Sequence, residues 1–186
     1  MRALLVLLAL AGCASPPSDL YTLAAIPGTP VHTPRRAIEM RRIGLAAYLD
    51  RSEIVRSNAA YRLRVAANDR WAEPLGTMLG RVLTEDLVQR LPDASIFLES
   101  GAISTTPDLI LEIDIQRFDP GADDSVILLA QIAVRRENTT SNRATTARTV
   151  RLAVPAATPA TADLAAALSR TLGQLADTIA TEVAAR

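Results

Sequence analysis

Cysteine, histidine and aromatic residues are scarce in this 186-residue sequence, and each scarcity excludes a class of protein. The single cysteine, Cys13, excludes an intrachain disulfide, and with only one histidine, His32, a Cys/His zinc site has too few ligands. Aromatic residues make up 3% of the chain, so we expect an aliphatic core of leucine, isoleucine, valine and alanine. The sequence predicts no metal site and no cofactor.

Excess charge of either sign is also absent. Lys plus Arg and Asp plus Glu each number 20, and the formal net charge is zero. Proteins that bind nucleic acid through bulk electrostatics need a basic excess, so no nucleic-acid partner is expected. The hydrophobic fraction of 49% excludes a wholly disordered chain. The length suits one ordinary domain.

A long apolar run that would span a membrane is missing from the N-terminus, which instead carries a short one. Residues 1–12 read MRALLVLLALAG, with Arg2 followed by an unbroken apolar stretch over 3–10. A spanning helix needs about 20 such residues. The run has the length and the charged start of a secretory signal peptide, which we assign to residues 1–12.

The sole cysteine follows this run directly. Leu10, Ala11 and Gly12 precede Cys13, and this order resembles the lipobox of bacterial lipoproteins. The resemblance implies cleavage before Cys13, a diacylglycerol group on its thiol and a third acyl chain, such as palmitate, on its new amino terminus. Ala14 stands where an aspartate would retain a lipoprotein in the inner membrane, so the periplasmic face of the outer membrane is expected.

Residues 13–36 are predicted to be the lipidated N-terminus and a Pro-rich tether, with an edge strand over 20–23. His32 lies in this tether and is predicted to be a solvated loop residue, because a general base needs an orienting partner and none is near in sequence. A single periplasmic domain is expected over 37–186.

Hydrophobic periodicity predicts the first half of this domain as three strands and a helix. Apolar residues alternate over 38–45 with a change of phase that indicates a bulge at 41–42. A short strand around 54–55 and a half-buried strand over 61–65 follow. Leucines at every fourth position then predict a helix over 69–91.

The second half continues with strands and a closing helix. Four strands are expected, over 95–98, 109–118, 126–134 and 150–154. The polar segment 138–142 is expected to be a turn. Asp69 is a candidate N-cap for the first helix, and Thr158 followed by Pro159 for the second, whose apolar stripe runs from Leu164 to Val183. The order β-β-β-α-β-β-β-β-α predicts an α+β fold, a largely antiparallel sheet with two helices packed on one face.

The sequence offers little for catalysis. It has no phosphate-binding loop, and its acidic pairs, Glu112 with Asp114 and Asp123 with Asp124, fall on the polar face of a strand and in a turn. We interpret them as solvated surface and predict no catalytic residues, with a periplasmic hydrolase that uses these carboxylates as a rival hypothesis.

Two segments carry a resemblance to a known family. Tyr48, Leu49, Asp50 and Arg51 follow a strand, and Trp71-Ala72-Glu73-Pro74-Leu75 opens a helix. Together with Leu20-Tyr21-Thr22-Leu23, these segments are similar to the ABC-type transport auxiliary lipoproteins, which accompany MCE-type proteins.

The resemblance implies a non-enzymatic docking or conduit subunit of an MCE/ABC-type lipid transport system that links the inner and outer membranes. An MCE-domain protein and ABC transporter subunits would be its partners, with ATP hydrolysis in another subunit. A homo-oligomer is also expected, because several small domains can build a ring. A structural envelope lipoprotein that handles no lipid is the alternative.

The motif residues are predicted to form an interface. The candidates are Tyr48, Leu49, Asp50, Arg51, Trp71, Glu73, Pro74 and Leu75. Trp71 has a second interpretation as a core residue at the start of the helix, since Trp is typical of both settings. Arg51 and Glu73 are expected to pair and to pin the loop to the helix.

Overall fold

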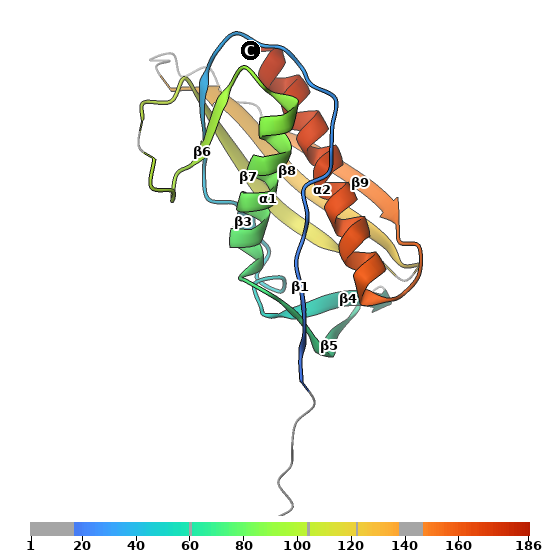
Figure 1. The fold of residues 1–186 in the computed structure, drawn as a ribbon. Helices are drawn as coiled ribbons and strands as arrows, with labels where there is room; N and C mark the ends of the chain where they lie inside the picture. The colour runs from blue at the N-terminus through green and yellow to red at the C-terminus, as the bar shows by residue number, and fades with distance from the viewer. Residues whose placement is uncertain (1–16, 60, 104, 122, 138–146) are drawn as a thin grey trace, which may run out of the picture.

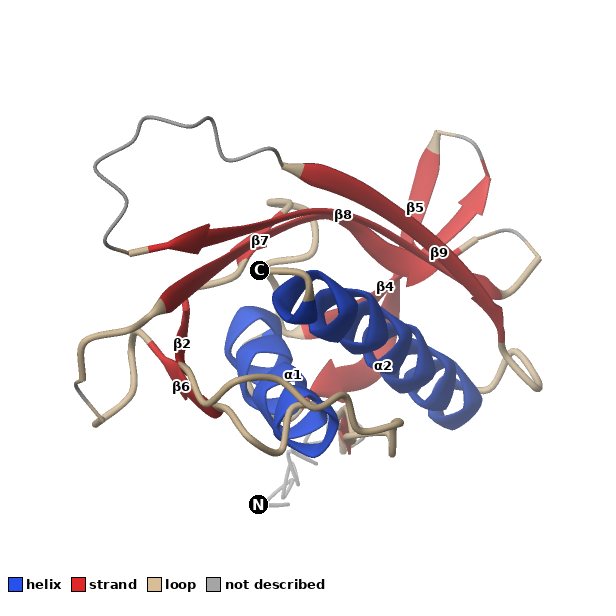
Figure 2. Cartoon of the chain, turned by 90° about the horizontal axis from the view of Figure 1, so that it is seen from above, coloured by secondary structure: helices blue, strands red, loops and turns tan. Residues whose placement is uncertain are grey.

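A six-stranded sheet covered on one face by two helices forms the body of the fold (Figures 1 and 2). The computed structural model describes residues 17–59, 61–103, 105–121, 123–137 and 147–186. The sheet has the order β6-β2-β7-β8-β9, and β3 pairs with β7 beyond the end of β2. Its strands are β2 Ala37–Met40, β3 Gly44–Leu45, β6 Ser95–Leu98, β7 Leu109–Pro120, β8 Ser125–Arg136 and β9 Arg148–Pro155, and the helices are α1 Leu75–Arg90 and α2 Thr161–Ala184.

A smaller sheet lies at the end of the molecule where the N-terminal segment enters (Figure 1). Its order is β1-β5-β4, with β1 Asp19–Tyr21, β4 Glu53–Ala59 and β5 Arg62–Trp71. The edge strand that was expected over 20–23 is therefore present as β1, shifted by one residue at its start. It pairs in parallel with the last three residues of β5, Asp69 to Trp71.

The predicted α+β class is confirmed, and the sheets are mixed. The long pairs β4–β5, β7–β8 and β8–β9 are antiparallel because each joins neighbouring strands of the chain. The short pairs that involve β1, β2 and β3 are parallel. β2 reaches β6 and β7 only after the chain has passed through α1, and such crossovers favour parallel pairing.

The predicted bulge at 41–42 is confirmed as the break between β2 and β3. Met40 is opposite Leu111 and Gly44 is opposite Asp114, so the β2–β3 segment contains one extra residue relative to β7. This extra residue reverses the face on which the following side chains lie, as the change of phase in the sequence indicated.

The core between sheet and helices is almost entirely aliphatic, as predicted. Alternate residues of β7 and β8 point toward the helices, and both helices bury one apolar stripe against them. The two stripes consist of Leu75, Met78, Leu79, Val82, Leu83 and Leu87 from α1 and of Leu164, Leu168, Leu172, Leu175, Ile179 and Val183 from α2. Each of these side chains contributes roughly 1.5–3 kcal/mol to stability by its burial.

Both helices begin later than predicted. β5 continues through Trp71, whose amide donates to the carbonyl oxygen of Ser52 (2.7 Å), so α1 starts only at Leu75. Asp69 caps no helix, because its carboxylate accepts a hydrogen bond from the hydroxyl of Thr161. α2 starts at Thr161 rather than after Thr158. At α1, the pairing of β5 overrides the local helix-start signal.

The strand that was predicted to be half-buried over 61–65 is exposed on both faces. Leu63 and Val65 are 47% and 43% exposed, and Tyr61 is fully exposed. Their alternation with arginines is that of a strand with one covered face, but the β4–β5 hairpin extends beyond the two helices (Figure 2).

The Pro-rich segment is not a free tether in its described part. Leu23 is 1% exposed within the core. In Figure 1 the segment runs along the helices from β1 to the opposite end of the molecule. We call residues 22–31 the N-terminal strap. The folded part thus begins at β1 and not near Ala37, because prolines exclude helix and sheet without excluding packing.

Candidate functional site

A groove of about 510 Å³ lies beside the first turns of α1. One wall comes from residues 42–45 and Asp50, and another from α1. A third comes from Leu98 of β6 and from Ser100. The lining residues are Arg42, Ile43, Gly44, Leu45, Asp50, Pro74, Gly76, Thr77, Gly80, Leu98 and Ser100. The volume is in the range of sites that hold a small ligand or an anchoring side chain.

Two glycines of α1 keep this groove open. A Cβ atom at Gly76 would meet no other atom within 4 Å, so this position faces empty space. A Cβ atom at Gly80 would lie 3.4 Å from Leu98, which is ordinary contact. Glycine in a helix costs about 0.8–1 kcal/mol relative to alanine, and no close approach requires it at Gly76. The open groove is therefore the structural consequence of this costly residue.

The predicted interface residues divide into groove, core and surface. Asp50 and Pro74 line the groove. Leu49, Trp71 and Leu75 are buried in the core, with Trp71 7% exposed, so the structure favours the core interpretation of Trp71.

Arg51 and Glu73 do not form the pair that was expected. Arg51 is exposed, whereas the carboxylate of Glu73 accepts hydrogen bonds from Arg81 Nη2 at 2.7 Å and from its Nε at 3.1 Å. Arg81 lies in α1, eight residues after Glu73, and also contacts Glu85. Glu73 therefore pairs with an arginine of α1 and not with Arg51.

Tyr48 anchors the turn that borders the groove. Its hydroxyl donates to Asp119 Oδ2 at 2.6 Å, and Arg117 Nε donates to the other oxygen at 2.9 Å. Burial, together with the hydrogen bond to Asp119, raises the pKa of Tyr48 well above its usual range. The phenol is therefore a structural donor that holds the 46–50 turn against β7.

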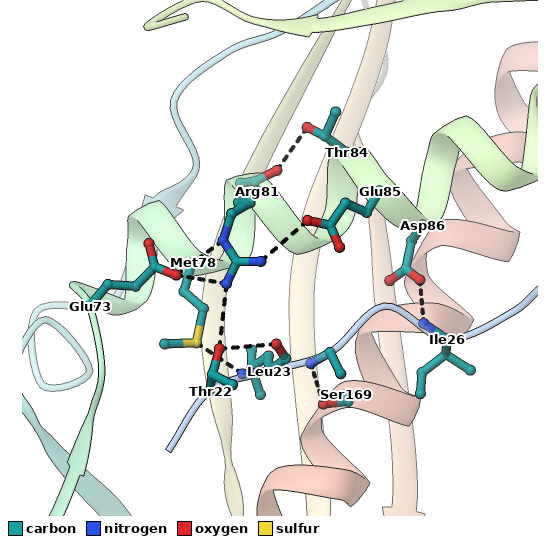
Figure 3. Close-up of polar contacts among 12 residues, drawn as sticks. Thr22, Leu23, Ile26, Glu73, Met78, Arg81, Thr84, Glu85, Asp86 and Ser169 are labelled. Atoms are coloured by element: carbon teal, nitrogen blue, oxygen red, sulfur yellow. Dashed lines mark hydrogen bonds and ion pairs between the residues drawn. The ribbon is translucent and has the colours of Figure 1, made fainter. Parts of the chain in front are cut away.

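A second polar cluster, which holds the strap against both helices, was missed by the sequence analysis (Figure 3). The amide of Leu23 donates to Met78 Sδ at 3.2 Å, that of Ala24 to Ser169 Oγ at 3.1 Å, and that of Ile26 to Asp86 Oδ1 at 2.7 Å. These contacts satisfy backbone donors of a segment that belongs to no sheet.

Arg90 is the centre of this cluster. Its side chain is 2% exposed, and its guanidinium donates to Asp177 Oδ1 at 2.6 Å and to the carbonyl oxygen of Ile26 at 2.9 Å and lies 3.5 Å from Asp86 Oδ1. Gly28 passes directly over it, since a Cβ atom there would lie 2.2 Å from the Arg90 Cζ atom. Arg90 therefore connects α1, α2 and the strap.

Burial raises the pKa of Asp86 to about 6, against the opposing influence of the Ile26 amide and Arg90. One sequence signal pointed to this pair. Met78 and Val82 form an apolar row of α1 at a spacing of four, and Asp86 and Arg90 continue the same row. Charged residues in an apolar row indicate a buried ion pair.

The remaining candidate residues lie on the surface. His32 is exposed, but it has the orienting partner that the sequence did not reveal, since its Nδ1 atom is 2.8 Å from Asp93 Oδ2. Glu112 pairs with Arg135, and Asp123 accepts from the amide of Ser125. Among the described residues no group of three or more His, Cys, Asp or Glu side chains could hold a metal ion.

The N-terminal predictions concern residues that the structure does not describe. Leu10, Ala11, Gly12 and Cys13 lie outside the described ranges, as does the turn expected over 138–142. In the part of the chain that is described, neither helix is long and apolar enough to cross a membrane.

Comparison with known proteins identifies a family by sequence and a fold by structure. Residues 21–180 match the model of a family described as "ABC-type transport auxiliary lipoprotein component". No curated protein matches the sequence.

Solved structures that share the fold include the following three. An uncharacterized protein superposes with a TM-score of 0.75 at 17% identity, over 90% of this chain and 99% of the other. A protein from Xanthomonas campestris has a TM-score of 0.73 at 18% identity, over 90% and 95%. A hypothetical protein from Chlamydia trachomatis has a TM-score of 0.52 at 8% identity, over 82% and 99%. At these identities the similarity concerns the fold alone.

Proposed function

Since the chain belongs to the family of ABC-type transport auxiliary lipoprotein components, we propose that it is the outer-membrane lipoprotein of an MCE/ABC-type lipid transport system. It acts without catalysis of its own, as a docking or conduit subunit for an MCE-domain protein and the transporter subunits. Several copies associate in this role. Cys13 carries the lipid anchor on the periplasmic face of the outer membrane.

One observation supports docking above the others. The groove beside α1 is bordered by the two segments that carry the family resemblance, through Asp50 on one side and Pro74 on the other. Its lining is apolar at Ile43, Leu45 and Leu98, with Arg42 and Asp50 as charged lining residues. An apolar recess with a few charged groups is the usual receptor for an anchoring side chain of a partner.

Filling the groove is expected to weaken partner binding while leaving the fold intact. In Gly76→Leu the new side chain enters empty space, and leucine is the better helix former by nearly 1 kcal/mol, so the free energy of unfolding should not fall. Affinity of the full chain for the MCE-domain protein should drop tenfold or more, because blocking a hot-spot pocket costs about 2 kcal/mol.

The matched control is Gln89→Leu, which adds the same side chain at an exposed position near the other end of α1. It should bind like the wild type. Equal affinities for both variants would contradict docking at the groove. A wild-type chain that binds neither the MCE-domain protein nor the transporter would support the structural-lipoprotein alternative.

Lipidation at Cys13 is expected to be lost completely in Cys13→Ser, because Cys13 is the only thiol in the chain. Cells that are fed labelled palmitate should label the wild-type protein and not the variant, and mass spectrometry should find Cys13 as the acylated first residue. Ala14→Asp is the control, since it should keep the label and move the protein to the inner membrane. Label retained in Cys13→Ser would overturn the lipoprotein assignment.

A further inference from the structure

Exposed apolar side chains gather on the three-stranded sheet. Six large apolar residues are exposed among those that the structure describes, and four of them lie on or beside β1 and β5. These four are Leu20, Tyr61, Leu63 and Val65, and the other two, Val88 and Ile103, lie on α1 and in the loop after β6. Single exposed apolar residues need no explanation, but a concentration at one end of a molecule indicates a contact surface.

The hairpin that carries three of these residues is amphipathic. Leu63 and Val65 are two apart in β5 and share one face of the strand, whereas Arg62 and Arg64 lie on the other. Arg64 is opposite Arg56 in β4. The β4–β5 pair therefore carries basic residues at facing positions next to the apolar ones.

The outer part of this hairpin is also cationic, although the chain as a whole is neutral. Residues 55–68 contain Arg56, Arg62 and Arg64 and no acidic residue, while the whole chain has zero net charge. The remainder of the chain is therefore net negative. A basic patch with apolar neighbours is the chemistry that recognises an anionic lipid surface, where each arginine near the headgroups contributes about 1 kcal/mol.

The proposed anchor brings this hairpin to a membrane. β1 begins at Asp19, which pairs with Asp69 of β5. Only five residues lie between Cys13 and Asp19, so the chain that joins them reaches at most about 20 Å. In Figure 1 the three-stranded sheet lies at the end of the molecule where the described chain begins. The acyl chains thus hold the small sheet, rather than the opposite end, beside the lipid surface.

We propose that the β4–β5 hairpin is a membrane-contact element that inserts Tyr61, Leu63 and Val65 among the headgroups of an anionic leaflet. The inference rests on the proposed lipidation of Cys13. Tyr61 lies at the interface, as tyrosines do at membrane surfaces, and Arg62 and Arg64 supply the positive charge that attracts the headgroup phosphates. With the acyl chains as one attachment and the hairpin as another, the domain takes a fixed orientation on the membrane.

The hairpin also has a rigid connection to the body of the molecule. Arg56 Nη1 donates to the carbonyl oxygen of Pro159 at 2.6 Å, and Nη2 donates to the hydroxyl of Thr161 at 2.8 Å, at the start of α2. Trp71, at the end of β5, is buried in the core. A hairpin fixed at both points transmits its orientation on the membrane to the helices and to the groove.

Tryptophan fluorescence of the anchored protein tests this contact. The full lipidated chain with Tyr61→Trp is reconstituted into vesicles of phosphatidylglycerol and phosphatidylethanolamine, some of them carrying brominated acyl chains. Val88→Trp and Ile103→Trp are matched controls at other exposed apolar positions, and native Trp71 supplies a constant buried background. Tyr61→Trp should show a blue shift and quenching by the brominated lipid, and both controls should show neither.

Charge and salt provide the second measurement. Arg62→Gln and Arg64→Gln in the Tyr61→Trp background should each lower the ratio of membrane-bound to free hairpin about fivefold. Neutral phosphatidylcholine vesicles or high salt should lower it as well.

Failure of the lipid anchor and failure of the hairpin contact give different results. A chain that does not float with vesicles refutes the anchor, whereas a chain that floats with Tyr61→Trp unquenched refutes the hairpin contact. A blue shift without quenching that disappears when the protein is diluted in the vesicles would place a second copy on the hairpin, and this too would overturn the proposal.

Discussion

Replacing Arg90 with alanine is expected to lower the free energy of unfolding by about 3–5 kcal/mol, because it removes one partner of a buried ion pair. Arg90 is 1% exposed and Asp86 is fully buried, and no other cation is close enough to form an ion pair with Asp86 among the described residues. The variant also loses the hydrogen bonds from Arg90 to Asp177 and to the carbonyl oxygen of Ile26. Chemical denaturation of the full chain measures the change.

The loss should depend on pH in a definite direction. The pKa of Asp86 is raised from its ordinary value of 3.8 to about 6 in the folded protein, first by burial, and removal of Arg90 raises it further. A carboxyl with a raised folded-state pKa destabilises the fold above that pKa, and the penalty disappears as the pH falls through it. Arg90→Ala should therefore lose less stability at pH 5 than at pH 8.

Two variants separate the buried charge from lost packing. Arg81→Ala removes an exposed arginine that also contacts two carboxylates, and it should cost at most about 1 kcal/mol. Asp86→Asn combined with Arg90→Ala should be more stable at pH 8 than Arg90→Ala alone, because no uncompensated charge remains. If Arg90→Ala lowers the free energy of unfolding no more than Arg81→Ala does, the contacts of Arg90 with the N-terminal strap and Asp86 are not a major source of stability.

Trp71→Ala is expected to destabilise the domain by about 3–5 kcal/mol, the usual cost of deleting a large aromatic side chain from a core. Trp71 is 7% exposed, at the end of β5 and opposite Tyr21 of β1. The cavity would lie where the small sheet joins the main core, so thermal unfolding should occur at a markedly lower temperature.

Tyr61→Ala is the control, since Tyr61 is a fully exposed aromatic in the same hairpin and should change stability by no more than about 0.5 kcal/mol. Light scattering of both variants reports self-association. A Trp71→Ala protein with normal melting and weakened assembly would restore the interface interpretation of this residue and contradict its role in the core.

Much of the fold was predictable because its signals are local. Apolar residues recur with a period of two in β7 and β8 and of nearly four in α1. About ten residues of sequence are therefore enough to predict which face of each element is buried. The bulge between β2 and β3 was equally local, because one extra residue must reverse the phase. The motif at 71–75 was predicted to form an interface, and the structure places its Pro74 at the groove and its Trp71 and Leu75 in the core.

The features that sequence reasoning missed depend on segments far apart in the chain. Asp86 has a partner in the strap, 60 residues away, and β5 extends to Trp71 because β1 pairs with it. Likewise, the strap follows the helices because the amides of Leu23, Ala24 and Ile26 find acceptors on them. Such choices are decided by which donors and acceptors the folded chain brings together, and no short window contains that information.

By itself, then, the sequence determined the α+β class, the aliphatic core, the two helices, most of the strands and the family, since periodicity, composition and motif are properties of the chain alone. The tertiary structure decided that Trp71 is core, that Glu73 pairs with Arg81, that Arg90 lies under the strap and that the alternating strand at 61–65 is exposed. The physical reason is the same in each case. Burial and partnership are relations between distant residues, and an apolar side chain is buried only where the fold supplies another surface to cover it.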